Sequence, residues 1–372
     1  MSDLSRQINR YSERNAWREL IIAEATTGQT PEPAAMAAVR RYPAMSSLEQ
    51  MIVLTAAPTI EKLQRISHGD VEMAIQRPLR GRPWQAEALL REARQDLMWL
   101  EGSEHELIWV GDARYPASLK RVFDPPAMMY AWGDVAALSG TGPSIAMVGT
   151  RHPDDSGRRG AFELGAAAAR YGFSVVSGLA LGVDAATHRG TVAAGRGDRA
   201  VAVLGSGIDT IYPRRNRDFA GAILDAGGVL VSEYPPGTLP KRHQFPARNR
   251  IIAGLSDALV LFQAPEGSGA LITVEHALDI GLTIVVHVSG AGWTGVKSLT
   301  DNAARYVESI DHVVRILQED AILPRTWQPP EPHFNEENGD YDAERLARFG
   351  PPESPQSVET WREHLQTAGG FE

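Results

Sequence analysis

The sequence predicts an α/β protein whose central domain is a doubly wound, Rossmann-like, mostly parallel sheet. Between residues 144 and 290, short runs rich in β-branched residues alternate with helical stretches of about 10–15 residues. The runs are continuously apolar, as expected of parallel strands that are covered on both faces. Glycine-containing loops follow most of the runs, at the ends where a doubly wound sheet binds its ligands.

The predicted strands and helices follow one another regularly along this region. The strands are Ser144–Gly149, Phe173–Ser177, Ala200–Leu204, Val229–Tyr234, Ala258–Gln263 and Thr283–Val288. The helices between them begin near Gly157, Asp184, Asn216, Asn249 and Leu271. Asp184 is interpreted as the N-cap of its helix, because aspartate accepts hydrogen bonds from free amides at that position.

The two ends of the chain differ from this central region. Residues 1–104 carry apolar stripes at helical spacing that prolines interrupt, which predicts a small helical N-terminal domain. The Rossmann-like domain is predicted over 105–318, with its core at 144–290. Residues 319–372 are acidic and rich in proline, which predicts a largely disordered tail with one short helix near Val358–Gln366.

Composition excludes several classes of function. The chain of 372 residues has no cysteine, which excludes disulfides, thiolate zinc sites and cysteine nucleophiles. It has no apolar run of about 18 residues, and its first residues, Met1–Arg6, do not begin a signal peptide. We therefore expect a cytoplasmic protein that does not insert into a membrane.

The net charge of −9 is distributed unevenly. Residues 144–290 contain 14 basic and 13 acidic side chains, whereas residues 319–372 contain 4 basic and 12 acidic ones. The acidity therefore lies outside the predicted sheet, and the overall charge does not argue against a nucleic-acid-binding surface on it.

A group of basic residues follows the third and fourth predicted strands. It comprises Arg214, Arg215, Arg217, Lys241, Arg242, Arg248 and Arg250, and Arg151 joins it from the loop after the first strand. Guanidinium groups bind phosphate through two donors and stay charged. Tyr212, Phe219 and Phe245 lie nearby in the sequence and are candidates for stacking on bases. The alternative is a solvated basic surface with aromatic residues in the core.

Motifs of other activities are missing or incomplete. No G-x-G-x-x-G follows the first strand, and Thr210 replaces the third glycine after Gly205 and Gly207. The run from Gly290 to Lys297 places its lysine one residue too late for a P-loop. Neither H-E-x-x-H nor G-x-S-x-G occurs. These patterns predict neither a dinucleotide-dependent enzyme nor an NTPase.

Six blocks match a known family in order and spacing. They are Ile145-Ala-Met-Val-Gly-Thr-Arg151, Val176-Ser-Gly-Leu-Ala-Leu-Gly-Val-Asp-Ala-Ala-Thr-His-Arg-Gly190, Ala202-Val-Leu-Gly-Ser-Gly-Ile-Asp-Thr-Ile-Tyr-Pro213, Ser232-Glu-Tyr-Pro-Pro-Gly237, Phe245-Pro-Ala-Arg-Asn-Arg-Ile-Ile-Ala-Gly254 and Gly267-Ser-Gly-Ala-Leu-Ile-Thr273. They resemble the DNA-processing protein A (DprA/Smf) family over about Asp112–Ala304.

The resemblance implies a protein that binds single-stranded DNA (ssDNA) and is not an enzyme, with no cofactor and no metal. Members of this family protect incoming strands in natural transformation and help to load the recombinase RecA, so the implied partners are ssDNA and a RecA-type recombinase. The resemblance also implies an extended Rossmann-like fold and a homodimer through that domain. Leu181 stands where many members carry arginine, which implies one phosphate contact fewer.

Charge, loop position and the resemblance together give the candidate nucleic-acid-binding residues. Arg151 matches the family's G-[ST]-R arginine, Arg214 matches the basic position after Tyr-Pro, and Arg248–Arg250 matches its F-P-x-R-N-R block. The complete set is Gly149, Thr150, Arg151, Ser177, Gly178, Gly205, Arg214, Arg215, Asn216, Arg217, Lys241, Arg248, Asn249, Arg250, Gly267 and Ser268.

Two other functions remain open at this stage. One is a regulator that binds a small nucleotide at the same edge of the sheet and acts on a partner. The other is an enzyme similar to nucleoside-monophosphate phosphoribohydrolases, whose P-G-G-x-G-T-x-x-E loop has an imperfect counterpart at Glu266–Glu275. In that enzyme Glu275 would be the catalytic acid.

Overall fold

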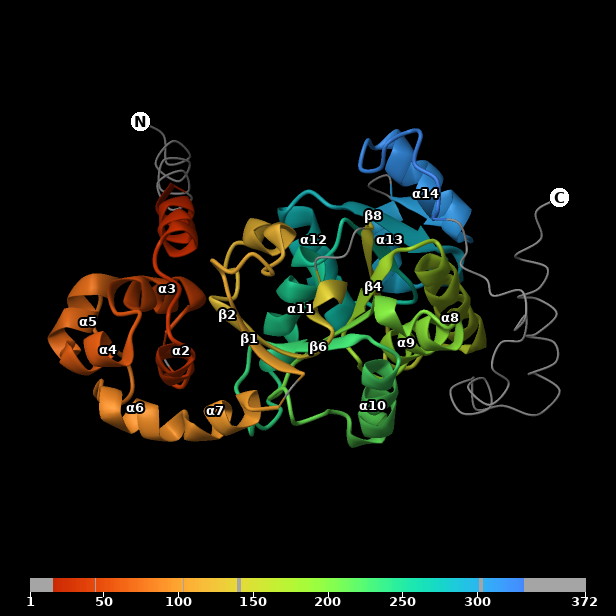
Figure 1. Cartoon of the computed structure of the whole chain (residues 1–372). Coiled ribbons are helices and arrows are strands. Elements are labelled where there is room, and N and C mark those ends of the chain that lie inside the picture. The colour runs from red at the N-terminus through yellow and green to blue at the C-terminus, as the bar shows by residue number, and fades with distance from the viewer. Residues whose placement is uncertain (1–15, 44, 103, 139–141, 301–303, 331–372) are drawn as a thin grey trace, which may run out of the picture.

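The computed structural model describes residues 16–43, 45–102, 104–138, 142–300 and 304–330. The described helices of the N-terminal part gather at one end of the molecule, beside β1 and β2 (Figure 1). The large sheet and its covering helices form the rest. The helix expected near Val358–Gln366 and most of the acidic tail lie outside the described residues.

The N-terminal part is helical, as predicted. A helix over residues 16–27 precedes α2 (Pro33–Arg40), α3 (Ser47–Ala56), α4 (Ile60–Arg65), α5 (His68–Ile75), α6 (Ala86–Glu92) and α7 (Arg94–Leu100). Local capping explains where several begin. At α3, Ser46 Oγ accepts from the Glu49 amide (3.3 Å) and the Glu49 carboxylate accepts from the Ser46 amide (2.8 Å), which satisfies two free donors at once.

The described strands form one nine-stranded sheet with the order β1-β2-β6-β5-β4-β3-β7-β8-β9. They are β1 (His105–Trp109), β2 (Met128–Gly133), β3 (Ser144–Val148), β4 (Ser174–Ser177), β5 (Ala200–Leu204), β6 (Val229–Ser232), β7 (Ala258–Leu261), β8 (Thr283–His287) and β9 (Arg305–Val307). The pairs β1–β2 and β2–β6 are antiparallel, and the remaining pairs are parallel. The α/β prediction is confirmed, although sequence periodicity did not identify β1, β2 and β9.

The strand order creates a topological switch point beside β3. From β3 the chain adds β4, β5 and β6 on one side, and it then returns to place β7 on the other side of β3. The connections after β3 and β7 therefore leave the sheet in opposite directions. In doubly wound sheets ligands bind in the crevice that this divergence opens.

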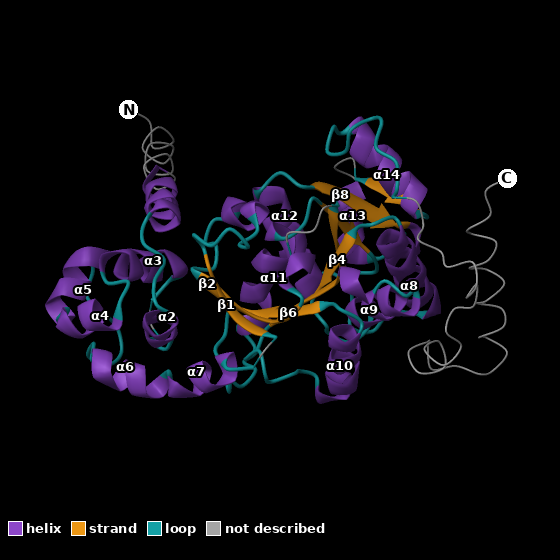
Figure 2. Cartoon of the chain, viewed as in Figure 1, coloured by secondary structure: helices purple, strands orange, loops and turns teal. Residues whose placement is uncertain are grey.

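Helices cover both faces of the sheet (Figure 2). Ile145 and Met147 of β3 pack in one core cluster with α8 (Asp155–Arg170), α9 (Val183–Ala193) and α14 (Ile310–Glu319). Ala146 and Val148 pack in the other cluster, with α11 (Gln244–Gly254) and α12 (Gly269–Asp279). Two further helices are α10 (Arg217–Asp225) and α13 (Thr294–Thr300). This alternation along one strand explains why the predicted strands are apolar throughout.

The chain stays packed beyond the predicted start of the tail at residue 319. Leu323 is buried, and the Trp327 ring lies 5.6 Å from the ring of Phe173, centre to centre. Residues 319–330 therefore belong structurally to the sheet domain. In the part of the chain that the structure describes, no helix combines the length and the apolar character that crossing a membrane requires.

Close packing of α8 against α9 depends on glycine. A Cβ atom at Gly190 would overlap the Phe162 carbonyl oxygen of α8. We therefore expect Gly190→Ala to lower the free energy of unfolding by about 1–3 kcal/mol, because rigid backbone must separate to admit the methyl group. Urea denaturation measures the change.

Gly221→Ala is the matched control for this prediction. Gly221 lies in α10 with open space around its Cα, so alanine there is expected to stabilise the helix by up to about 1 kcal/mol. Glycine to alanine is thus expected to change the free energy of unfolding in opposite directions at the two sites. Equal effects would show that the α8–α9 contact is not limited by glycine.

Candidate nucleic-acid interface

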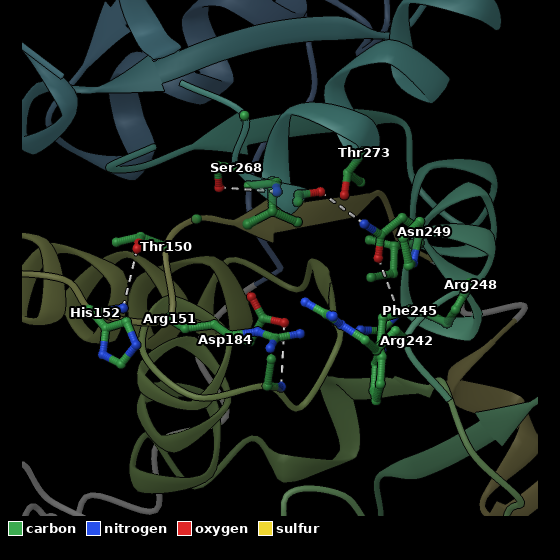
Figure 3. Close-up of a pocket in the computed structure, with 18 of the residues that line it drawn as sticks. Thr150, Arg151, His152, Asp184, Arg242, Phe245, Arg248, Asn249, Ser268 and Thr273 are labelled. Atoms are coloured by element: carbon green, nitrogen blue, oxygen red, sulfur yellow. Dashed lines mark hydrogen bonds between the residues drawn. The ribbon is translucent and has the colours of Figure 1, made fainter. Parts of the chain in front are cut away.

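A cavity of about 640 Å³ lies at the switch point. Its walls come from the loops after β3 and β7, the loop before α9, the first turn of α12, and one face of α11. Figure 3 shows Thr150 and Arg151 on one side of the cavity, and Phe245 and Asn249 of α11 on the other. Segments that are far apart in the sequence therefore meet where the strand order predicts a ligand.

The loop after β3 is fixed by backbone hydrogen bonds. The Thr150 amide donates to the Gln263 carbonyl (2.7 Å), and the Thr150 carbonyl accepts from the Val183 amide (3.2 Å) at the start of α9. Gly149 leaves room for the Val183 side chain, which a Cβ atom would strike. Arg151 is consequently exposed at the rim of the cavity, and its guanidinium carbon lies 5.6 Å from the centre of the Phe245 ring.

The loop after β4 has an unusual backbone that two polar side chains hold in place. Leu179 has φ +54°, which is rare for a residue with a side chain. The Asp184 carboxylate accepts from the amides of Gly178 (3.2 Å) and Ala180 (3.4 Å), and Asn216 Nδ2 donates to the Leu179 carbonyl (2.9 Å). The interpretation of Asp184 as an N-cap is wrong, since the N-cap of α9 is Gly182.

One face of α11 lines the cavity. Phe245, Arg248, Asn249 and Ile252 follow the spacing i, i+3, i+4 and i+7, which places their side chains on the same side of a helix. The helix begins at Gln244, five residues before the predicted start near Asn249. Arg248 and Asn249 therefore lie inside the helix rather than at its open end.

Arg248 supplies a fixed positive charge to the cavity wall. Only 4% of the residue is exposed, and its Nη1 donates to the carbonyls of Gly178 (2.8 Å) and Val203. Burial lowers the pKa of Arg248 to about 10, with Asp184 acting in the opposite direction. The side chain therefore stays charged at neutral pH, but it is held by the protein and not free to follow a ligand.

The first turn of α12 completes the wall beside α11. Ser268 Oγ accepts from the Ala270 amide (3.3 Å), and Asn249 Nδ2 donates to the Gly269 carbonyl (3.0 Å). Gly267, with φ +70°, makes the turn that brings the chain into this helix. A helix N-terminus carries partial positive charge, so this turn adds to the attraction for an anion.

Two aromatic rings lie at the cavity. Tyr212 is 44% exposed, and its ring centre is 5.4 Å from that of Phe245. Gly205 makes room for this arrangement, because a Cβ atom there would strike the Phe245 ring. Phe219, the third candidate for stacking on bases, is buried in the core. Phe219 is therefore not available to stack on bases, contrary to the expectation from the sequence.

Further exposed cations lie close to cavity residues in the sequence. Arg242 lies at the edge of the cavity and is exposed. Arg214, Arg215, Arg217 and Lys241 are also exposed, and among the described residues no carboxylate lies within ion-pair distance of their charged groups. Arg214 and Arg215 belong to the short 3₁₀ helix η4 (Arg214–Asn216), which begins two residues after Tyr212. Positive charge therefore extends from the cavity onto the surface.

The predicted site residues fall into distinct groups. Seven of them line the cavity: Gly149, Thr150, Arg151, Arg248, Asn249, Gly267 and Ser268. Four others contact residues of the cavity wall without lining it. Gly178, Gly205 and Asn216 do so through the contacts described above. Ser177 is fully buried and donates to the Met147 carbonyl (2.7 Å). Arg214, Arg215, Arg217 and Lys241 are exposed but do not line the cavity.

The position of Arg250 does not fit the predicted phosphate contact. Its Nη2 donates to Glu233 Oε1 (2.7 Å) and its Nε to the Asp124 carbonyl (2.7 Å), and it does not line the cavity. Arg242 belonged to the basic group in the sequence but not to the final candidate set, and it lines the cavity together with His152 and Thr273, which the sequence did not single out. A predicted helix start at Gln244 would have placed Arg242 directly before the first turn of α11.

The glutamate that a phosphoribohydrolase-like enzyme would need is not at the cavity. Glu275 is exposed on α12 and does not line it. Among the described residues, no group of three or more histidines and carboxylates has the arrangement that would hold a metal ion. The cavity lining combines cations, backbone amides and two aromatic rings with the carboxylate of Asp184.

Known proteins share sequence and fold with this chain. The sequence profile of the family described as DNA recombination-mediator protein A matches residues 106–318, more than half of the chain. The chain belongs to this family. Among relatives, the protein Smf of Synechocystis is 45% identical over 168 residues, which are 45% of this chain and 42% of that protein. The DNA processing protein DprA of Bacillus subtilis is 41% identical over 172 residues, 46% of this chain and 57% of that protein.

Solved structures of the DprA/Smf family share the fold. DNA processing protein A from Streptococcus pneumoniae matches with a TM-score of 0.62 and 26% identity, over 77% of this chain and 98% of that one. The Helicobacter pylori protein, whose structure concerns its mode of binding single-stranded DNA, matches with a TM-score of 0.52 and 25% identity, over 58% of this chain and 97% of that one. The chain spans 42% to 65% of the length of the first four curated relatives that it matches.

Proposed function

We propose that this protein binds single-stranded DNA at the switch-point cavity and the cations around it, without catalysing a reaction. The observation that carries the proposal is the meeting of exposed arginines with two aromatic rings at one edge of the sheet. Arg151 and Arg242 contact phosphates, and Tyr212 and Phe245 offer faces for bases. Exposed Arg214, Arg215 and Arg217 extend the track beyond the cavity.

Each part of the surface has a separate task in this proposal. The fixed charge of Arg248 and the first turn of α12 attract a phosphate into the cavity. The exposed arginines follow neighbouring phosphates of the strand. Contacts of this kind act on the backbone of DNA and give little sequence preference. The ssDNA-binding mode studied for the relative from Helicobacter pylori supports the same ligand class.

Family membership also supports a proposal for the wider role. We propose that the protein works in the cytoplasm, where it protects incoming single strands and helps to load a RecA-type recombinase onto them. Pairing of two copies through the sheet domain would join two binding surfaces into one longer track. These roles rest on the DprA/Smf family and on the surface described above.

A length series of single-stranded oligonucleotides tests the proposal. Affinity is expected to rise from mononucleotide to about 20 nucleotides and to fall with salt, by about 0.7 log units per log unit of salt for each phosphate bound. Fluorescence anisotropy at two salt concentrations measures both quantities. Tight binding of a mononucleotide, with no gain from added length, would instead support the nucleotide-sensing alternative.

A further inference from the structure

The segment that joins β6 to α11, residues 233–243, is held by the helical domain. Arg40 Nε donates to the Glu233 carbonyl (2.6 Å), and the Arg40 guanidinium carbon lies 5.4 Å from the centre of the Tyr234 ring. Arg41 Nη2 donates to the Pro236 carbonyl (2.9 Å). Two consecutive arginines at the end of α2 therefore hold the chain directly before the helix that lines the cavity.

The Glu233 side chain connects the helical domain to α11 itself. Its Oε1 accepts from Ser47 Oγ of α3 (3.0 Å) and from Arg250 Nη2 of α11 (2.7 Å). Glu233 is only 9% exposed, so water competes little for these hydrogen bonds. One buried carboxylate oxygen thus joins side chains that are 203 positions apart in the sequence.

Arg250 lies on the back of α11. It follows Arg248 by two residues, which corresponds to a rotation of about 200° around a helix. The front of the same helix carries Phe245, Arg248 and Asn249 at the cavity. A shift of Glu233 would consequently move the cavity wall, although Glu233 itself does not line the cavity.

A buried carboxylate of the helical domain fixes the side chain of Arg41. The Arg41 guanidinium forms an ion pair with Asp96 of α7, and the Tyr130 hydroxyl of β2 donates to Asp96 Oδ2 (2.9 Å). The Asp96 side chain is fully buried. Gly237, with φ +77°, turns the segment so that it passes closely beside Gln95 of α7. Arg41 is therefore oriented before it meets the Pro236 carbonyl.

We propose that the helical domain positions α11 for ssDNA binding through Arg40, Ser47, Glu233 and Arg250. This inference rests on the proposed function of the cavity and assigns a task to a domain outside it. The four side chains are positioning residues, because they act through α11 and not on DNA. Their loss is expected to weaken binding of ssDNA without removing a phosphate contact.

The test uses the full-length double variant Arg40→Ala/Ser47→Ala, which removes the two side chains of the helical domain that donate to Glu233 and leaves the contact of Arg41 with Pro236 in place. Its affinity for a 20-nucleotide single strand is expected to fall about three- to tenfold. The slope of log affinity against log salt is expected to stay at the wild-type value, because that slope counts neutralised phosphates. Hydrogen exchange in α11 is expected to accelerate, whereas exchange in α8 stays unchanged.

Arg65→Ala is the matched control, since it removes the same charge from a side chain of the helical domain that is 76% exposed. It is expected to bind ssDNA like wild type. The single variant Ser47→Ala is expected to lower the affinity for ssDNA in the same direction by a smaller factor. It serves as a second test if the double variant folds poorly. Wild-type affinity in the double variant, or a loss accompanied by a lower salt slope, would overturn the positioning role. Failure of the wild-type protein to bind ssDNA would instead overturn the proposed function.

Discussion

Replacing Arg151 and Arg242 together by alanine is expected to lower the affinity for a 20-nucleotide single strand by on the order of 100-fold or more at low salt. Both side chains are exposed at the cavity, and charge-assisted hydrogen bonds contribute about 1.5–3 kcal/mol each. The salt slope should fall by about 1.4, because two phosphates are no longer neutralised. Fluorescence anisotropy titrations over a range of salt concentrations measure both effects.

The control for this prediction is the double variant Arg91→Ala/Arg94→Ala. These arginines are exposed on α6 and α7 of the helical domain, and their removal changes the net charge by the same amount. The control is expected to keep nearly the full affinity and salt slope. If both double variants lose affinity equally, general attraction by the charge of the protein explains binding, and the cavity is not the site.

Glu233→Gln is expected to lower the free energy of unfolding by about 3–5 kcal/mol at neutral pH. The substitution leaves Arg250 largely buried without its principal partner, since the other carboxylate, Asp124, lies 3.8 Å away. Removing one member of a buried ion pair has a cost of this size, because the remaining charge is not compensated. Urea denaturation measures the loss, and Glu61→Gln at an exposed ion pair with Arg65 is expected to stay within about 1 kcal/mol of wild type.

The ionisation of Glu233 is expected to make the stability of the fold depend on pH. Burial alone would raise the pKa of Glu233, but Arg250 and Arg40 lower the pKa to about 2, below the ordinary value of 4.5. A carboxylate with a lowered pKa stabilises the fold fully above the unfolded value, and this contribution disappears as pH falls from about 4.5 toward 2. Wild type should therefore lose stability more steeply than Glu233→Gln between pH 5 and 3. Parallel curves for the two proteins would contradict this role of Glu233.

Local sequence signals were sufficient for the central sheet and for most loops at its edge. The apolar runs that became β3 to β8 were visible because each strand is buried on both faces and needs no partner to be identified. The strands β1 and β9 were missed because they are the two edges of the sheet, where pairing with a neighbour decides the structure, and β2 was missed together with its partner β1. Strand propensity is weak evidence in such positions.

The candidate site was predicted less completely than the fold. Arg151, Arg248 and Asn249 were placed at the cavity by their positions after strands and by the family resemblance. Arg250 was grouped with them because it is a neighbouring arginine, and spacing alone does not show which side of a helix faces a ligand. Its partner, Glu233, comes from a different segment, so this ion pair could not be derived from the local sequence.

The sequence by itself determined which segments become buried strands, which loops turn through glycine, and which family the chain resembles. These features depend on residues within a few positions of one another, and short-range sterics and apolar periodicity control them. Only the tertiary structure decided which arginines face the cavity and which are neutralised. The physical reason is that the state of a charge depends on its burial and on partners brought close by folding, as Glu233 and Ser47 are for α11.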